Sequence, residues 1–164
     1  MSEEYEAEAK AVLDACRARG LKVATAESCT GGLVAGALTE IAGSSDVFDR
    51  GFVTYSNEAK QQMLGVSTET LRDYGAVSRQ TAQEMARGAI AHSNADIAVA
   101  ITGIAGPGGG SKDKPVGLVH FTVGTRGGAL THDEIRYGDI GRAAVRAKSV
   151  LQALAMLRAM AQSA

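Results

Sequence analysis

The sequence has too few residues of several kinds to support some common classes of protein. Its two cysteines, Cys16 and Cys29, cannot build a disulfide framework or a four-ligand zinc site. Its 17 basic and 18 acidic residues nearly cancel, which leaves no overall field to attract nucleic acid or an anionic membrane. A basic patch interleaved with aromatic residues is also missing. We therefore expect no nucleic-acid partner, reduced cysteines, and Cys16 in the core.

Long apolar runs are equally scarce. No stretch approaches the roughly 20 apolar residues of a membrane span, and the acidic start MSEEYE does not resemble a signal peptide. These observations predict a cytoplasmic protein without a membrane partner. An apolar fraction of 45% and a charged fraction of 21% are ordinary for a globular chain, and the length predicts one domain over 1–164.

Hydrophobic spacing and turn residues predict alternating helices and strands. Helices are expected over 5–19, 31–42, 57–64, 67–74 and 79–93, with a last one opened by Asp139. Strands are expected over 21–26, 51–55, 97–101, 116–125 and 129–137, the last two forming a hairpin. The glycine-rich stretch 102–115 is expected to be a loop. This order predicts an α/β fold, a three-layer α/β/α sandwich around a mixed sheet.

Several familiar binding motifs are absent. The stretch GGGSK (108–112) lacks the ending of a phosphate-binding P-loop, and no dinucleotide fingerprint follows the first strand. The histidines His92, His120 and His132 form no pair at metal-binding spacing. We therefore expect neither a metal nor a cofactor.

One serine and one lysine fit hydrolytic chemistry. Ser28 follows the first strand at a turn into a helix, where the N–H groups of residues 29–32 can form an oxyanion hole; these are Cys29, Thr30, Gly31 and Gly32. Lys60 is the candidate base, provided that its pKa falls by roughly 3 units through burial. Taken singly, Ser28 is more typical of a helix cap and Lys60 of an exposed charge. Cys29 is a rival nucleophile without an evident histidine partner.

Four segments in order resemble the CinA C-terminal domain family, and the resemblance covers nearly the whole chain. They are TAESCTGG (25–32), GFVTYSNEAK (51–60), GAVS (75–78) and TGIAGP (102–107). In this family, members that stand alone hydrolyse nicotinamide mononucleotide to nicotinate mononucleotide and ammonia. The resemblance implies that Ser28 and Lys60 form the catalytic dyad through an acyl-enzyme, assisted by Tyr55, with no cofactor.

The resemblance also implies a small-molecule nucleotide substrate. The 102–110 loop offers donors for it, represented by Thr102, Gly103 and Gly106, although a mobile surface loop is an alternative. The family often has GDR before its last helix, whereas this chain reads GDIGR (138–142), as if two residues were inserted. Arg142 and Arg146 are therefore weaker candidates for phosphate or ring contacts.

Other assignments stay open at this point. Glu27 is expected to organise the turn or to pair with Lys60. CinA domains also occur fused to other domains, so a non-catalytic interaction module is an alternative function, as is an amidase for another small amide. A homo-oligomer such as a dimer is expected from the family.

Overall fold

The structure is a computed structural model that describes residues 3–164, so Met1 and Ser2 of the expected domain lie outside the described residues. Five strands form one mixed sheet in the order β2-β1-β3-β4-β5. The strands are β1 (Val23–Glu27), β2 (Phe48–Val53), β3 (Ile97–Gly103), β4 (Leu118–Thr125) and β5 (Leu130–Arg136). β1 runs parallel to β2 and β3, whereas β3, β4 and β5 pair antiparallel in sequence.

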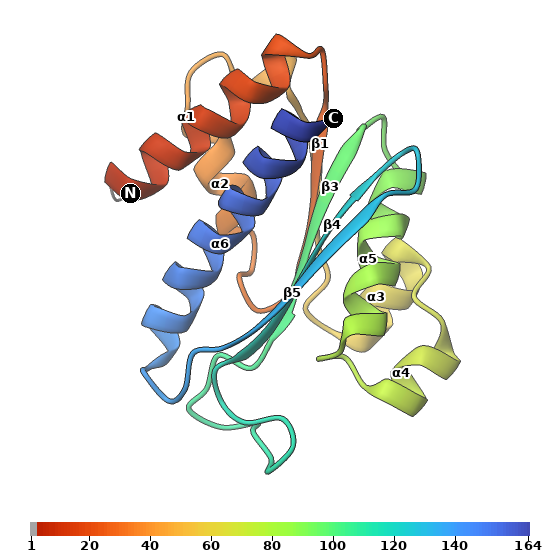
Figure 1. Ribbon diagram of the computed structural model, residues 1–164. Helices are drawn as coiled ribbons and strands as arrows, with labels where there is room; N and C mark the ends of the chain where they lie inside the picture. Colours follow the sequence, from red (N-terminus) through yellow and green to blue (C-terminus); the bar gives the residue numbers. More distant parts are fainter. Residues whose placement is uncertain (1–2) are drawn as a thin grey trace.

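Helices cover both faces of this sheet (Figure 1). One face carries α1 (Glu3–Ala18), α2 (Leu33–Thr39) and α6 (Arg142–Ser163). The other carries α3 (Asn57–Leu64), α4 (Thr68–Tyr74) and α5 (Arg79–Ala91), and a short 3-10 turn, η1 (Ser44–Asp46), precedes β2. The predicted three-layer sandwich with a mixed sheet is thus confirmed. Within residues 3–164, no helix is both long and apolar enough to cross a membrane.

The central strand β3 divides the core into two parts of different character. Ile97, Val99 and Ile101 face the layer of α1, α2 and α6, whereas Ala98 and Ala100 face the layer of α5. Small side chains on the second face of the sheet let α5 pack closely against it. Within the helix layer, α5 also lies close to the end of α3, because a Cβ added at Gly88 would lie 2.0 Å from the carbonyl oxygen of Leu64. Cys16 is completely buried, as expected.

Several predicted boundaries were wrong. The strand expected over 51–55 spans Phe48–Val53, and the helix expected over 31–42 spans Leu33–Thr39. Two further differences each have a backbone reason. Thr102 and Gly103 belong to β3 rather than to the loop, because they pair with His120 and Val119 of β4 and extend the ladder. The last helix begins at Arg142 rather than at Asp139. The chain takes a positive φ at Gly141 (99°), which interrupts any helix that starts earlier.

Candidate active site

The carboxyl ends of β1, β2 and β3 meet at one edge of the sheet, because these strands are parallel. Ser28 directly follows β1, and its N–H donates to the carbonyl of Ile101 at 2.9 Å. Lys60 is the fourth residue of α3, whose N-terminus is capped by Ser56. The fold therefore brings Ser28 and Lys60 together from segments 32 residues apart.

The two side chains are in direct contact and almost inaccessible to solvent. Lys60 Nζ donates to Ser28 Oγ at 3.0 Å and to the carbonyl oxygen of Thr54 at 2.8 Å. Lys60 is 1% exposed and Ser28 is 8% exposed. The burial of Lys60 contradicts the interpretation of this residue as an exposed charge. Its amine lies within hydrogen-bond distance of the Ser28 hydroxyl, which is the distance that a base for this serine requires.

Burial lowers the pKa of Lys60 to about 8, because desolvation penalises the ammonium form. At pH 7, about a tenth of such a lysine is neutral. Burial has the opposite effect on the neighbouring thiol and raises the pKa of Cys29 to about 12. A thiolate nucleophile is therefore disfavoured at neutral pH, whereas a neutral amine beside Ser28 is accessible.

The turn after Ser28 supplies backbone donors. Gly31 and Gly32 have positive φ angles of 58° and 102°, which let the chain reverse before α2. The N–H of Gly31 is occupied, because it donates to Ser28 O at 3.0 Å. The N–H groups of Cys29, Thr30 and Gly32 make no hydrogen bond to another residue within residues 3–164. Thr30 is completely buried, so the donors expected for an oxyanion narrow to the amides of Cys29 and Gly32.

A pocket of about 270 Å³ opens onto the pair. Its lining joins the three strand-end loops to the start of α6: Ser28, Cys29, Tyr55, Asn57, Lys60, Ala76, Val77, Thr102, Gly103, Ile104, Ala105, Gly106, Gly108, Gly109 and Arg142. The sequence did not predict Asn57, Ala76 and Val77 as lining residues, although all three lie inside the quoted segments. Asn57 was identifiable as the first residue after the Ser56 cap.

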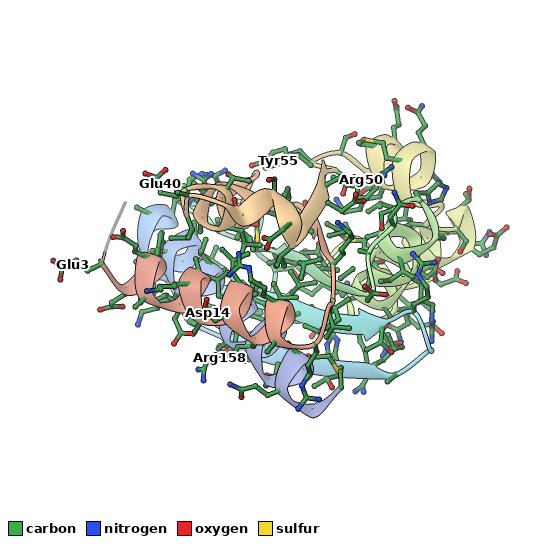
Figure 2. The ribbon with its side chains drawn as sticks, turned by 90° about the horizontal axis from the view of Figure 1, so that it is seen from above. Glu3, Asp14, Glu40, Arg50, Tyr55 and Arg158 are labelled. Atoms are coloured by element: carbon green, nitrogen blue, oxygen red, sulfur yellow. The ribbon has the colours of Figure 1, made fainter. Side chains whose placement is uncertain are left out.

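Arg142 connects two parts of the pocket rim, the residue Tyr55 after β2 and the loop after β3. Its guanidinium donates to Tyr55 Oη at 2.6 Å and to the carbonyl oxygen of Gly106 at 2.9 Å. Tyr55 lies at the periphery of the molecule and is 60% exposed (Figure 2). The Thr102 hydroxyl is turned to the protein, since it donates to Ala76 O at 2.8 Å. Arg142 and Tyr55 thus lie side by side at the rim of the pocket.

Several candidate residues lie outside this lining, namely Glu27, Thr30, Gly31, Gly32 and Arg146. Arg146 points at the backbone of the Ser28 turn, donating to the carbonyl oxygens of Cys29 and Thr30. The Glu27 carboxylate accepts hydrogen bonds from Thr30, Val34 and Ala35. Glu27 therefore organises the turn, and no ion pair with Lys60 is formed.

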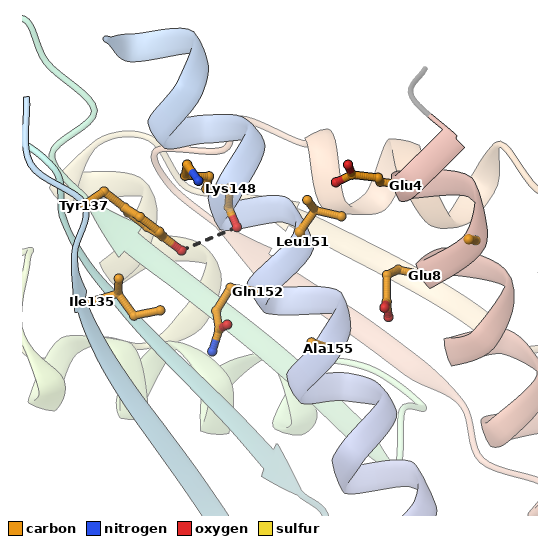
Figure 3. A pocket seen from close by; sticks show the side chains of 9 residues that line it. Glu4, Glu8, Ile135, Tyr137, Lys148, Leu151, Gln152 and Ala155 are labelled. Carbon is orange, nitrogen blue, oxygen red and sulfur yellow. Dashed lines mark hydrogen bonds between the residues drawn. The ribbon is translucent and has the colours of Figure 1, made fainter. Parts of the chain in front are cut away.

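Another hollow of the surface lacks this combination of a serine and a lysine. A hollow of about 560 Å³ lies between α1, β5 and α6 (Figure 3), where Tyr137 donates to the carbonyl oxygen of Lys148 at 3.4 Å. It contains no nucleophile beside a base.

His120 and His132 are closer than the sequence indicated, because Nδ1 of His120 lies 3.0 Å from Nε2 of His132. Within residues 3–164, however, no three His, Cys, Asp or Glu side chains are grouped to hold a metal ion.

The chain is similar to known proteins along most of its length. The CinA C-terminal domain family matches residues 5–161. The nicotinamide-nucleotide amidohydrolase PncC of Escherichia coli strain K12 is 57% identical over 144 residues, which cover 87% of this chain and 86% of that protein. A protein of the same name from Enterobacter agglomerans is 55% identical and is covered to 85%. The crystal structure of the competence/damage inducible protein CihA from Agrobacterium tumefaciens has a TM-score of 0.95 at 60% identity, covering 97% of this chain and 96% of that one.

Proposed function

The chain belongs to the CinA C-terminal domain family, and on that premise we propose that it hydrolyses nicotinamide mononucleotide to nicotinate mononucleotide and ammonia. The relatives named nicotinamide-nucleotide amidohydrolase support the substrate and the reaction. The observation that carries the mechanism is the 3.0 Å contact between Lys60 Nζ and Ser28 Oγ in a buried position.

The first half of the reaction forms an acyl-enzyme. Neutral Lys60 takes the proton of Ser28, and Ser28 Oγ attacks the carboxamide carbon. The electron pair of the C=O double bond moves to the oxygen, which accepts a hydrogen bond from the N–H group of Cys29 at the pocket beside Ser28. The Lys60 ammonium then gives its proton to the amide nitrogen, the C–N bond breaks, and ammonia leaves.

The second half restores the serine. A water molecule attacks the ester carbon while Lys60 takes one of its protons. The ester C–O bond then breaks, and Lys60 returns the proton to Ser28, which releases nicotinate mononucleotide. The carbonyl oxygen of Thr54 holds Nζ in place during both halves, because it accepts a hydrogen bond at 2.8 Å.

The remaining groups of the pocket suit the nucleotide part of the substrate. Arg142 is a cation at the rim, and its guanidinium matches the geometry of a phosphate. Tyr55 lies beside it, and the loop from Ile104 to Gly109, whose Gly106 carbonyl oxygen accepts from Arg142, lines the same pocket. The cytoplasmic location and the homo-oligomer expected from the sequence are part of this proposal.

The test is ammonia release from nicotinamide mononucleotide by the purified protein. We expect activity in the wild type and its loss in folded Ser28→Ala and Lys60→Ala variants. Lys10→Ala is the matched control, because Lys10 is exposed on α1. An inactive wild type would refute the proposed substrate. An active Ser28→Ala variant would refute the acyl-enzyme.

A further inference from the structure

The turn that carries Ser28 is anchored on one side by Glu27, the last residue of β1. This carboxylate is completely buried. It accepts from the Thr30 hydroxyl at 2.6 Å and from the N–H groups of Val34 and Ala35 at 2.9 and 3.0 Å. The N-cap residue of α2 is Gly32, which has no side chain to cap the helix. Glu27 therefore supplies the acceptor that α2 lacks and joins it to the turn.

Arg146 anchors the same turn from α6. Its Nε donates to the carbonyl oxygen of Cys29 at 3.1 Å, and its Nη2 donates to that of Thr30 at 3.4 Å. A Cβ added at Gly31 would lie 3.2 Å from Arg146 Nη2, so the guanidinium packs directly against this glycine. Because Arg146 does not line the pocket, its contacts are with the backbone behind the nucleophile.

The direction of one amide follows from these contacts. The carbonyl of Cys29 and the N–H of Thr30 belong to the same peptide unit, and in a trans peptide the two groups point in opposite directions. Arg146 binds the oxygen, so the N–H of Thr30 points away from the guanidinium. Thr30 is completely buried and does not line the pocket, whereas Cys29 does. By binding the carbonyl oxygens of Cys29 and Thr30, Arg146 fixes the backbone of Cys29, whose N–H directly follows Ser28.

We propose that Glu27 and Arg146 are positioning residues that hold the Ser28 turn so that the N–H of Cys29, which lines the pocket beside Ser28, donates to the oxyanion. The inference rests on the proposed amidohydrolase function and assigns a role to two residues that do not touch the substrate. It also replaces the expectation that Arg146 contacts the nucleotide. A donor that acts on the oxyanion alone stabilises the transition state and not the bound substrate.

The first experiment separates these two roles of Arg146. We expect Arg146→Met to lower kcat for ammonia release by about 10- to 100-fold, somewhat less than the loss of a direct oxyanion donor, with KM changed less than about threefold. Arg158→Met is the control, because Arg158 lies on the same helix (Figure 2) and pairs with Glu8 far from the pocket. It should leave both constants unchanged. A raised KM at unchanged kcat would show substrate contact and overturn the inference, as would no change at all.

A second pair of variants tests the Glu27 side and does not depend on the folding of the Arg146 variant. Thr30→Ser keeps the hydroxyl that donates to Glu27, whereas Thr30→Val removes it at nearly constant volume. We expect kcat of the serine variant to exceed that of the valine variant by at least about tenfold. Equal values would overturn the role of Glu27. A wild type without ammonia release would instead refute the proposed function, so the two failures are distinguishable.

Discussion

Replacing Lys60 by methionine should stabilise the protein at neutral pH while removing its activity. Methionine fills a similar volume without a charge to desolvate. The pKa of Lys60 lies at about 8 in the folded state, against about 10.4 in an unfolded chain. Because the folded-state pKa is the lower one, the cost of burying the ammonium is fully present below pH 8. It disappears as the pH rises through the unfolded value.

The magnitude follows from the two pKa values. The cost at pH 7 is about 3 kcal/mol and at pH 10 about 1 kcal/mol, so the stability of the wild type relative to Lys60→Met should rise by about 2 to 3 kcal/mol across this interval. At pH 7, the loss of two hydrogen bonds, about 1 kcal/mol each, offsets part of the gain. The net stabilisation of the variant there is about 1 kcal/mol.

Urea denaturation of both proteins at pH 7 and pH 10 measures this difference. Other titrating groups are shared by the two proteins and cancel. Lys10→Met is the matched control, since Lys10 is exposed and its replacement should give a difference independent of pH over this range. If the Lys60→Met difference were equally independent of pH, Lys60 would have an ordinary pKa, and its role as a neutral base would be refuted.

Two further predictions follow from the same structure. The value of kcat/KM for ammonia release should rise about tenfold per pH unit below pH 8 and level off above it, because only neutral Lys60 accepts the serine proton; a flat profile from pH 6 to 9 would contradict this. Gly88→Ala should cost at least about 2 kcal/mol of unfolding free energy, since its Cβ would lie 2.0 Å from Leu64 O. Gly127→Ala, whose nearest atom is 3.9 Å away, should be near neutral in the same denaturation assay.

The sequence predicted the elements well where one local signal dominated. The helix over 57–64 was predicted with the correct bounds, because Ser56 caps it and Gly65 ends it in a left-handed conformation. Predictions failed where pairing between distant segments decides. Thr102 and Gly103 looked like loop residues by composition, and only the partner strand β4 makes them strand residues.

Burial was the part of the site that local sequence could not give. Lys60 lies in a segment of polar residues, NEAKQQ, which is typical of an exposed helix. Lys60 can be buried because its amine finds two hydrogen-bond acceptors, Ser28 Oγ after β1 and Thr54 O after the neighbouring strand β2. Those acceptors are set by strand order, which no local pattern encodes. For the same reason, the pKa of Lys60 follows from the fold and not from the motif.

The segment GDIGR (138–142) before α6 is the place where the family resemblance suggested two inserted residues. Gly138 and Gly141 have positive φ angles of 83° and 99°, so the chain turns there and the helix begins at Arg142. Arg142 and Arg146 keep their spacing of four residues and hence one face of α6. One guanidinium thus reaches the pocket rim while the next, one turn along, reaches the backbone of the Ser28 turn. Both arginines therefore lie on the helix that begins directly after Gly141, and each contacts the surroundings of Ser28 or the pocket rim.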